Sequence, residues 1–180
     1  MAGLMDNYNN VMREFIKRGA LVFKSLEEVA EWKQRNKADP TDGIVHYISH
    51  HGVEKEKSLT TPLRLVTNSA VKNCSTGPSV NDLWPKGPNS LKNLFKVLIR
   101  WRTYEVAMVY DLHKAYQSVL TTLKELFLRL IVWRFGDEEA DWETYGFSCM
   151  TFGDVPASVI LELVKALAAA KYEHIDPMAA

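Results

Sequence analysis

The chain has 180 residues, 47% of them hydrophobic and 24% charged. This length supports one sizeable core or two small lobes, and the composition is that of a folded domain, which excludes an intrinsically disordered chain. Lys plus Arg and Asp plus Glu number 22 each, so the net charge of zero argues neither for nor against a polyanionic partner, and only local charge can indicate nucleic-acid binding.

Residues 1–43 are predicted to be an N-terminal helical segment. The stretch from Val11 to Phe23 is amphipathic, and the sequence from Ser25 to Glu28 fits a capping box that begins a helix ending near Arg35. A cluster of Pro, Gly and Asp residues then breaks any helix, and we place the first internal boundary after residue 43.

Residues 44–90 are predicted to be a β-hairpin followed by a loop. Two short strands, 44–52 and 63–66, flank a charged turn. The stretch 73–88 contains three Pro-containing breaks, which exclude regular structure and predict an ordered loop held in place by Trp84.

Residues 91–180 are predicted to mix helices and strands. Apolar residues recur at three- and four-residue spacing from Leu91 to Ile99, which predicts a helix with one buried stripe that ends near Arg102. The apolar run 106–111 follows as a buried strand that ends on Asp111.

An antiparallel pair and a last helix follow in this third part. The strands are 127–134 and 142–149, joined by an acidic turn. Asp154 and Pro156 fit the cap and first turn of a final helix, and we expect its apolar residues Val159, Leu163 and Leu167 to face inward. The order of elements favours an α+β fold with antiparallel sheet and packed helices over a doubly wound parallel sheet.

Two clusters allow either a functional or a structural interpretation. His46, His50 and His51 could bind zinc, but no Cys or carboxylate stands at ligand spacing, so we favour strand histidines that contact backbone. Cys149 could act as a thiol nucleophile with a histidine and Asp154, yet no hydrolase signature surrounds it, so we expect a free, partly buried thiol.

A basic stretch surrounds Trp101. It could meet a phosphate backbone, and a solvated helix face explains it equally well. The residues are Lys86, Lys92, Lys96, Arg100 and Arg102.

Asp111 and Arg64 are the candidate catalytic and substrate-binding side chains. A carboxylate at the tip of a buried strand can be aimed at a metal ion, and Tyr116 could shape a pocket beside it; alternatively Asp111 is an ordinary surface residue. The rigid fork of an Arg projecting from a hairpin can clamp a triphosphate, although Arg64 alone could equally be an exposed strand residue.

Taken together, these patterns resemble the reverse transcriptases of long-terminal-repeat retrotransposons, in particular the BEL/Pao group. No single block of sequence is specific to this family. The occurrence of seven blocks in the same order, over about three fifths of the chain, is much more specific. The blocks are Tyr47–Val53, Thr61–Val66, Gly77–Asp82, Gly87–Asn89, Val109–Gln117, Val132–Arg134 and Thr151–Pro156.

The resemblance implies that residues 44–90 are fingers-like and residues 91–180 are the first part of a right-hand polymerase palm. Asp111 matches the first catalytic Asp, which would bind the Mg²⁺ ions that activate the primer hydroxyl for metal-dependent nucleotidyl transfer. Arg64 would contact the incoming nucleotide, and Tyr116 would exclude a ribose 2′-hydroxyl. The other implied substrate-binding residues are Leu112, His113, Lys114 and Ala115 beside the triphosphate, and Phe152 and Gly153 under the nucleotide and template.

The sequence also departs from this family. Thr67-Asn68 replaces a fingers Asp, the turn 152–156 is shorter than in many relatives, and no Tyr-x-Asp-Asp motif, the source of the other two metal-binding carboxylates, is present. Residues 173–180 resemble the stretch just before that motif. Because one carboxylate cannot hold two Mg²⁺ ions tightly, we predict that the 180-residue chain is a polymerase fragment that is inactive alone.

The expected partners are an RNA or DNA template-primer, deoxynucleoside triphosphates and the remainder of a polyprotein. No apolar stretch reaches membrane-spanning length, so we expect no membrane partner and an intracellular location, either the cytoplasm or a retrotransposon particle. An alternative is a domesticated, noncatalytic module that keeps the fold and binds nucleic acid or a protein. A small domain without any nucleic-acid role is the third interpretation.

Overall fold

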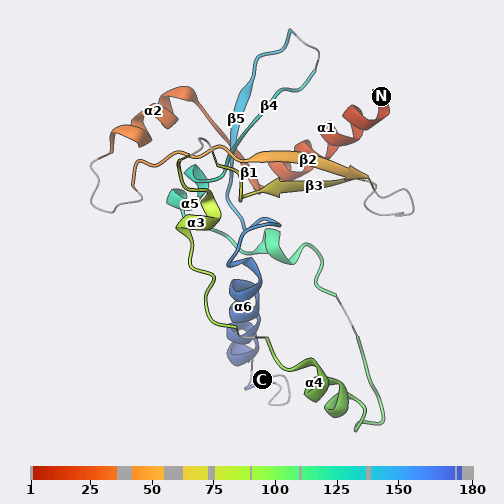
Figure 1. Cartoon of the computed structure of the whole chain (residues 1–180). Helices are drawn as coiled ribbons and strands as arrows, with labels where there is room; N and C mark the ends of the chain where they lie inside the picture. Colours follow the sequence, from red (N-terminus) through yellow and green to blue (C-terminus); the bar gives the residue numbers. More distant parts are fainter. Residues whose placement is uncertain are drawn as a thin grey trace.

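The computed structural model describes residues 2–35, 42–54, 63–72, 76–89, 91–109, 111–136, 139–172 and 174–175. Within these residues the fold is α+β, with two small antiparallel sheets and helices around them (Figure 1). The helices are α1 (Ala2–Lys17), α2 (Leu26–Gln34), α3 (Val80–Leu83), α4 (Leu94–Trp101), α5 (Leu123–Phe127) and α6 (Ala157–Tyr172), with a short 3₁₀ helix, η1 (Ala115–Ser118). The strands are β1 (Leu21–Lys24), β2 (Ser49–Glu54), β3 (Leu63–Asn68), β4 (Leu130–Trp133) and β5 (Glu143–Phe147).

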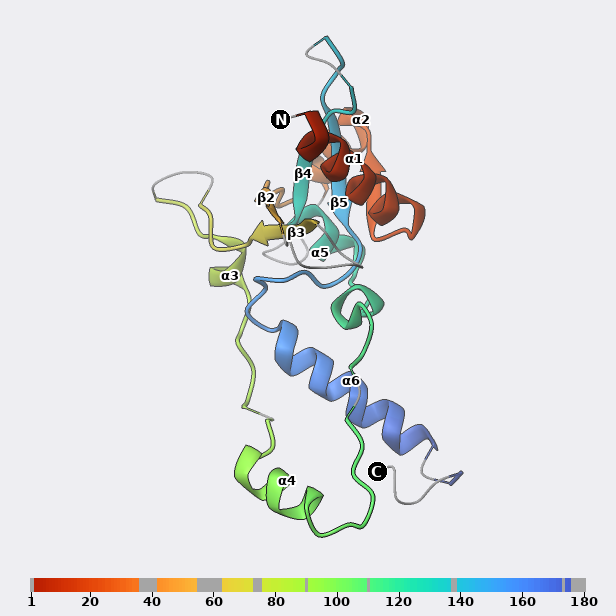
Figure 2. The ribbon, with the colours of Figure 1, turned by 90° about the vertical axis from the view of Figure 1, so that its right-hand side faces the viewer.

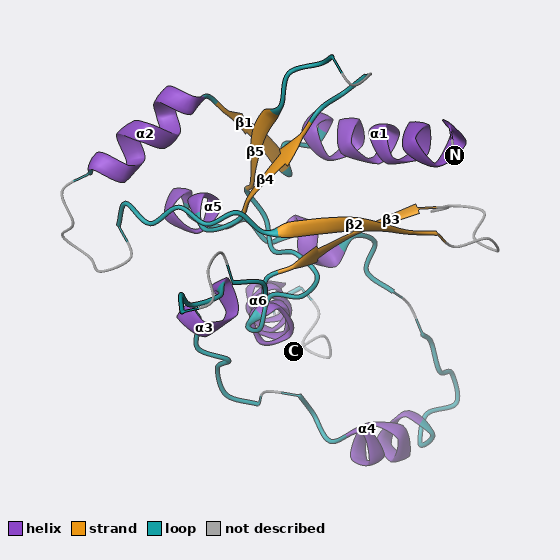
Figure 3. Ribbon diagram, turned by 45° about the horizontal axis from the view of Figure 1, so that its top comes forward, coloured by secondary structure: helices purple, strands orange, loops and turns teal. Residues whose placement is uncertain are grey.

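The larger sheet has the strand order β1-β5-β4 and the smaller one is the hairpin β2–β3 (Figure 3). Leu21 is opposite Phe147, and Leu130 is opposite Gly146. The first and third parts of the sequence therefore share one sheet. Gly146 is required in the middle of β5, because a Cβ there would lie 2.2 Å from Leu126 Cδ2.

The main core lies between α1, the three-stranded sheet and the hairpin. Met12 of α1 and Ile131 of β4 are completely buried, and Leu63 and Phe147 are 1% exposed. Tyr8 stacks on Trp133 with ring centroids 4.5 Å apart. We call the two sheets with α1, α2 and α5 the central body.

A second core cluster joins α2 to α5. Trp32 stacks on Phe127 with ring centroids 4.4 Å apart and an angle of 7° between the planes, and its indole N–H donates to the Ile44 carbonyl. Both N-terminal bonds of the capping box are present, since Ser25 Oγ accepts from Glu28 N and the Glu28 carboxylate accepts from Ser25 N. The sequence prediction for this helix is confirmed.

The chain leaves the central body after α3 and returns at η1. We call residues 91–113 the outer segment; α4 lies in it, far from both sheets, and α6 extends from the central body on the same side (Figure 2). Every described residue of the outer segment is exposed, including Phe95 at 71% and Val109 at 85%. This part of the chain therefore makes no core in the described structure.

Several further predictions are confirmed. The hairpin forms with β2 and β3 in antiparallel register, and β4 and β5 form the expected antiparallel pair. Trp84 packs against the main core, so it does hold its loop in place. The predicted boundary at 37–43 lies mostly outside the described residues, as does the charged turn of the hairpin.

Other predictions about local structure are wrong. The amphipathic stretch from Val11 to Phe23 is not one helix, because α1 ends at Lys17 and Gly19 takes a positive φ of 72° before β1. The first hairpin strand begins at Ser49 rather than at residue 44. The loop predicted over 73–88 contains the single helical turn α3, which is closed by a capping box between Ser79 and Asp82.

The outer segment and α6 supply the largest corrections. Residues 106–109 and 111–112 form no strand, and α4 has no buried stripe. Leu163 and Leu167 of α6 are 57% and 61% exposed rather than facing inward. In each case the apolar pattern predicts that one face of the element is buried, but no other described element lies against that face.

Among the described residues, no helix has the length and apolar character required to cross a membrane.

Candidate functional site

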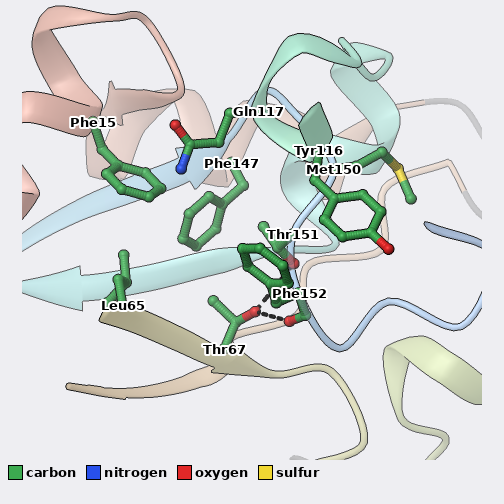
Figure 4. A pocket seen from close by; sticks show the side chains of 9 residues that line it. All are labelled: Phe15, Leu65, Thr67, Tyr116, Gln117, Phe147, Met150, Thr151 and Phe152. Atoms are coloured by element: carbon green, nitrogen blue, oxygen red, sulfur yellow. Dashed lines mark hydrogen bonds between the residues drawn. The ribbon is translucent and has the colours of Figure 1, made fainter. Parts of the chain in front are cut away.

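A small pocket lies where β3, η1 and the segment after β5 meet (Figure 4). Its cavity volume is only about 20 Å³, its walls are mostly apolar, and we call it the Tyr116 pocket. The hairpin, the 3₁₀ helix, α1 and the larger sheet all contribute to it. Its lining residues are Phe15, Leu65, Thr67, Tyr116, Gln117, Phe147, Met150, Thr151 and Phe152.

Two aromatic residues that are 36 positions apart in the sequence meet at the mouth of the pocket. The rings of Tyr116 and Phe152 are edge to face, with centroids 5.0 Å apart and an angle of 84° between the planes. Phe152 is 55% exposed, so part of its ring remains available for contact. Gln117 Oε1 is buried without a hydrogen-bond partner in the described structure, which leaves one acceptor beside the apolar walls.

Residues 151–155 form a tight turn against the hairpin, and we call it the Phe152 turn. Thr67 Oγ1 donates to the Phe152 carbonyl at 2.7 Å. Asn81 of α3 donates to the Gly153 carbonyl at 2.9 Å and accepts from Val155 N at 3.0 Å. Gly153 has a φ of 103°, and a Cβ there would lie 2.9 Å from the Thr67 carbonyl oxygen, so this position requires glycine.

A buried ion pair between Arg129 and Asp154 anchors the Phe152 turn to the interior of the protein. Arg129 is 0% exposed, and its Nη1 lies 3.1 Å from the Asp154 carboxylate. The same carboxylate accepts from Ser69 Oγ at 2.6 Å and from Thr151 N at 2.9 Å. Asp154 therefore does not cap α6 as the sequence predicts; its carboxylate is part of the interior.

Lys114 fixes the entry to η1. It has a φ of 52°, the one positive value among the described residues other than glycine, and its ammonium lies 2.6 Å from the Glu14 carboxylate of α1. The hydrogen bond from Lys114 lowers the pKa of Glu14, and the nearby charges of Arg18 and His113 act in the same direction. This ion pair joins the returning chain to the central body.

Asp111 lies outside the Tyr116 pocket. It is exposed, as are Leu112 and His113, and it ends no strand. Ala115 begins η1 and precedes Tyr116 directly. The structure therefore brings Tyr116 and Phe152 together, with Gly153 in the adjoining turn, but it does not bring Asp111 to them.

Arg64 points away from the pocket. Along β3 the side chains alternate, with Leu63, Leu65 and Thr67 buried and Arg64 exposed. Because Leu65 and Thr67 line the Tyr116 pocket, Arg64 lies on the opposite face of the hairpin. The basic residues around α4 are likewise exposed, and none of them lines the pocket.

Two histidines of the cluster, His46 and His50, are held by hydrogen bonds within the protein, while His51 is exposed. His46 Nε2 lies 3.1 Å from the Val71 carbonyl, and His50 contacts Tyr8 Oη at 2.5 Å and the Val132 carbonyl at 3.2 Å. Burial is the main cause of the lowered pKa of both imidazoles. These are the backbone-contacting histidines that the sequence favours.

Cys149 is a buried, free thiol whose pKa burial raises to about 11. A thiol with a raised pKa is a poor nucleophile, so the arrangement does not favour thiol catalysis. The described residues contain no group of three or more His, Cys, Asp or Glu side chains that could hold a metal ion. Mg²⁺ requires several anionic ligands, and Asp111 alone supplies a single carboxylate.

Sequence reasoning missed Arg129 and the interior role of Asp154. One signal was available, because Arg129 interrupts the apolar run from Leu126 to Trp133, and a cation inside such a run needs a buried acceptor. Nothing in the sequence identifies which of the 22 acidic residues that acceptor is.

Comparison with known proteins adds no assignment. No protein-family model matches the chain, and no curated protein sequence matches it with significance.

Proposed function

We propose that this chain is the fingers and first part of the palm of an RNA-directed DNA polymerase similar to the BEL/Pao reverse transcriptases, and that it acts in nucleotidyl transfer only as part of the complete enzyme. The observation that carries the proposal is the contact between Tyr116 and Phe152. The resemblance assigns both residues to the nucleotide, and the fold places them on one pocket although they are 36 positions apart.

The chemistry of the pocket fits part of a nucleotide rather than its phosphates. The cavity itself is too small for a sugar or base, so stacking and van der Waals contact with one would be made at its surface, by the exposed part of the Phe152 ring beside Tyr116. Gln117 Oε1 could accept a hydrogen bond from a hydroxyl or amino group. The pocket has no cationic lining residue, so triphosphate contacts must come from elsewhere, such as Arg64 in the proposed enzyme.

Asp111 is proposed to supply one carboxylate to the Mg²⁺ site of the complete polymerase. That role needs partners that the described residues do not contain, as well as a fixed backbone at Asp111, which is exposed and outside regular structure. We therefore assign this chain the binding and orientation of the nucleotide and no catalytic step of its own.

A titration of Mg²⁺ and a deoxynucleoside triphosphate tests the proposal. The 180-residue chain is compared with a version extended through a Tyr-x-Asp-Asp motif, and a gain of binding in the extended version alone is expected. In that version Asp111→Asn should abolish metal-dependent binding, while Asp141→Asn, at another exposed position, should not. Primer extension by the 180-residue chain with Mg²⁺ would contradict the proposal.

Tyr116→Ala provides a second arm. If Tyr116 excludes a 2′-hydroxyl, the variant of the extended enzyme should accept ribonucleotides more readily than the parent, by roughly tenfold or more in kcat/KM, because a steric clash is removed. The matched control is Tyr104→Ala in the outer segment, where the ring is 52% exposed.

A noncatalytic binding module remains the second candidate, and the exposed apolar side chains of α4 favour it, since a contiguous apolar surface is typical of protein interfaces. Binding of the chain to a primer-template that weakens steeply with salt would support nucleic-acid contact. Salt-independent association with protein and none with primer-template would favour the module.

A further inference from the structure

The carboxylate of Asp154 joins three separate parts of the chain. Ser69, which directly follows the hairpin, donates to one oxygen, and Arg129, which directly precedes β4, donates to the other. Thr151 N donates to this second oxygen too, which closes the Phe152 turn on itself. All four groups are buried, with exposed fractions of 6% or less.

Arg129 has no donor left for a ligand. Its five N–H groups meet five acceptors: the Glu125, Cys149 and Phe147 carbonyls, Thr121 Oγ1 and the Asp154 carboxylate. The face of its guanidinium also lies 5.2 Å from the Trp84 ring centroid. A guanidinium that is buried and saturated in this way can orient neighbouring groups but cannot bind a phosphate.

We propose that Arg129, Asp154 and Ser69 are positioning residues that hold the Phe152 turn at a fixed place against Tyr116, and that they thereby set the affinity of the Tyr116 pocket for a nucleotide. This inference rests on the proposed function. Phe152 is two residues from Asp154, and Thr67, which lines the opposite wall, is two residues from Ser69. The Asp154 carboxylate therefore connects the two walls through their buried ends, in addition to the direct hydrogen bonds from Thr67 to the turn.

The contacts of the turn show why this spacing depends on the network. Thr67 Oγ1 lies 3.1 Å from Thr151 Oγ1 and 2.7 Å from the Phe152 carbonyl, and Asn81 binds the Gly153 carbonyl and Val155 N at the far end of the turn. The half-exposed Phe152 ring has Tyr116 as its aromatic neighbour. If Ser69 releases Asp154, the hairpin holds the turn by the two hydrogen bonds of Thr67 alone, and the spacing between hairpin and turn is less constrained. The ring of Phe152 then loses its fixed position, while the reacting groups of a substrate are not touched.

Amide hydrogen exchange in the 180-residue chain tests the positioning role. Ser69→Ala should speed exchange at Thr151, Asp154 and Val155 by about tenfold, because one charge-assisted hydrogen bond is lost. Ser25→Ala is the matched control: it removes the capping hydroxyl of α2, at comparable cost, and should leave these amides unchanged. Equal exchange at the three amides in Ser69→Ala and in the parent chain would overturn the proposal.

Kinetics in the extended enzyme tests the consequence for the nucleotide. Ser69→Ala and Asp154→Asn should raise KM for a deoxynucleoside triphosphate by roughly tenfold and change kcat by less than about twofold, since only positioning is weakened. An unchanged KM in a Ser69→Ala enzyme that polymerises would also overturn the proposed positioning role. If the parent extended enzyme does not polymerise, the proposed function fails, and the exchange result decides the positioning role by itself.

Discussion

The central body and the outer segment carry similar apolar patterns but use them differently. In the central body, Met12 and Leu130 are fully buried, and even the cation of Arg129 finds five acceptors. In the outer segment, Phe95 and Val109 lie exposed. The difference teaches that an amphipathic pattern predicts a helix and its face, whereas burial requires a second surface that the pattern does not contain.

Arg129→Met should have the largest effect on stability and tests the interior half of this comparison. The change keeps most of the side-chain volume but leaves the buried Asp154 carboxylate without its cation, which costs about 3–5 kcal/mol. Denaturant unfolding measures the loss. Arg64→Met is the control, since that exposed side chain should change stability by less than about 0.5 kcal/mol.

The double variant Arg129→Met with Asp154→Leu sharpens the same point. Replacing both charges by apolar side chains removes the unpaired carboxylate, so part of the lost stability should return. A loss below about 1 kcal/mol in Arg129→Met alone would show that the carboxylate is solvated and that this interior is less closed than its contacts indicate.

Gly146→Ala should have the next largest effect. The added Cβ would meet Leu126 Cδ2 at 2.2 Å and Leu130 Cδ2 at 3.1 Å, and such overpacking costs about 1–3 kcal/mol. The midpoint of urea unfolding should fall accordingly. Gly3→Ala, which meets nothing within 4 Å on α1, should leave the midpoint unchanged or raise stability by up to about 1 kcal/mol. Equal midpoints for the two variants would refute the packing of β5 on α5.

The elements that the sequence predicted correctly are those whose signals are local. The capping box at Ser25 and the strand that carries an exposed Arg64 depend on residues within one turn or one strand, and both are confirmed. The contact between Tyr116 and Phe152 could be expected only through a resemblance. The partners of Arg129 lie up to 25 positions away, and no local rule selects them.

The failures have the same origin. The helix pattern gives Leu163 an apolar face and so predicts that it faces inward, and Val106 is predicted in a strand because it begins the apolar run 106–111. Both predictions assume that another element lies against that face. Among the described residues none does, so local preference alone decides, and the segment around Val106 forms no strand.

Acidification should destabilise the central body through the half-buried His50 and the buried His46. Burial lowers the pKa of His50 below its ordinary value of 6.5, so the unfolded chain binds more protons than the folded one as the pH falls through 6.5. Stability should therefore decrease below that pH and level off once the pH is below the lowered pKa. His46 acts in the same direction.

Thermal unfolding between pH 7.5 and 5 measures this dependence. Tm should fall with pH in the parent chain and fall less steeply in His50→Gln, which cannot take up the proton. His51→Gln, at an exposed position of the same strand, is the control and should keep the parent slope. An identical slope in all three proteins would show that the contacts of His50 with Tyr8 and Val132 open before the imidazole titrates.

The smallest effect on stability is expected in the outer segment. Val106→Ser with Met108→Ser removes two side chains that are each 74% exposed, so the free energy of unfolding should change by less than about 0.5 kcal/mol. Self-association should change far more. The apolar side chains of the outer segment, Phe95 and Val109 among them, lie uncovered, and uncovered apolar surface promotes association.

Sedimentation velocity over a range of protein concentrations separates these two effects. The parent chain should associate as its concentration rises, and the double serine variant should remain monomeric to higher concentration while unfolding at the same denaturant midpoint. Val53→Ser on the hairpin, where the side chain is 43% exposed, is the control for removing a single apolar group from the central body. If the variant instead lowers the free energy of unfolding by about 1 kcal/mol or more, the outer segment packs on the central body in solution, because only buried side chains contribute that much.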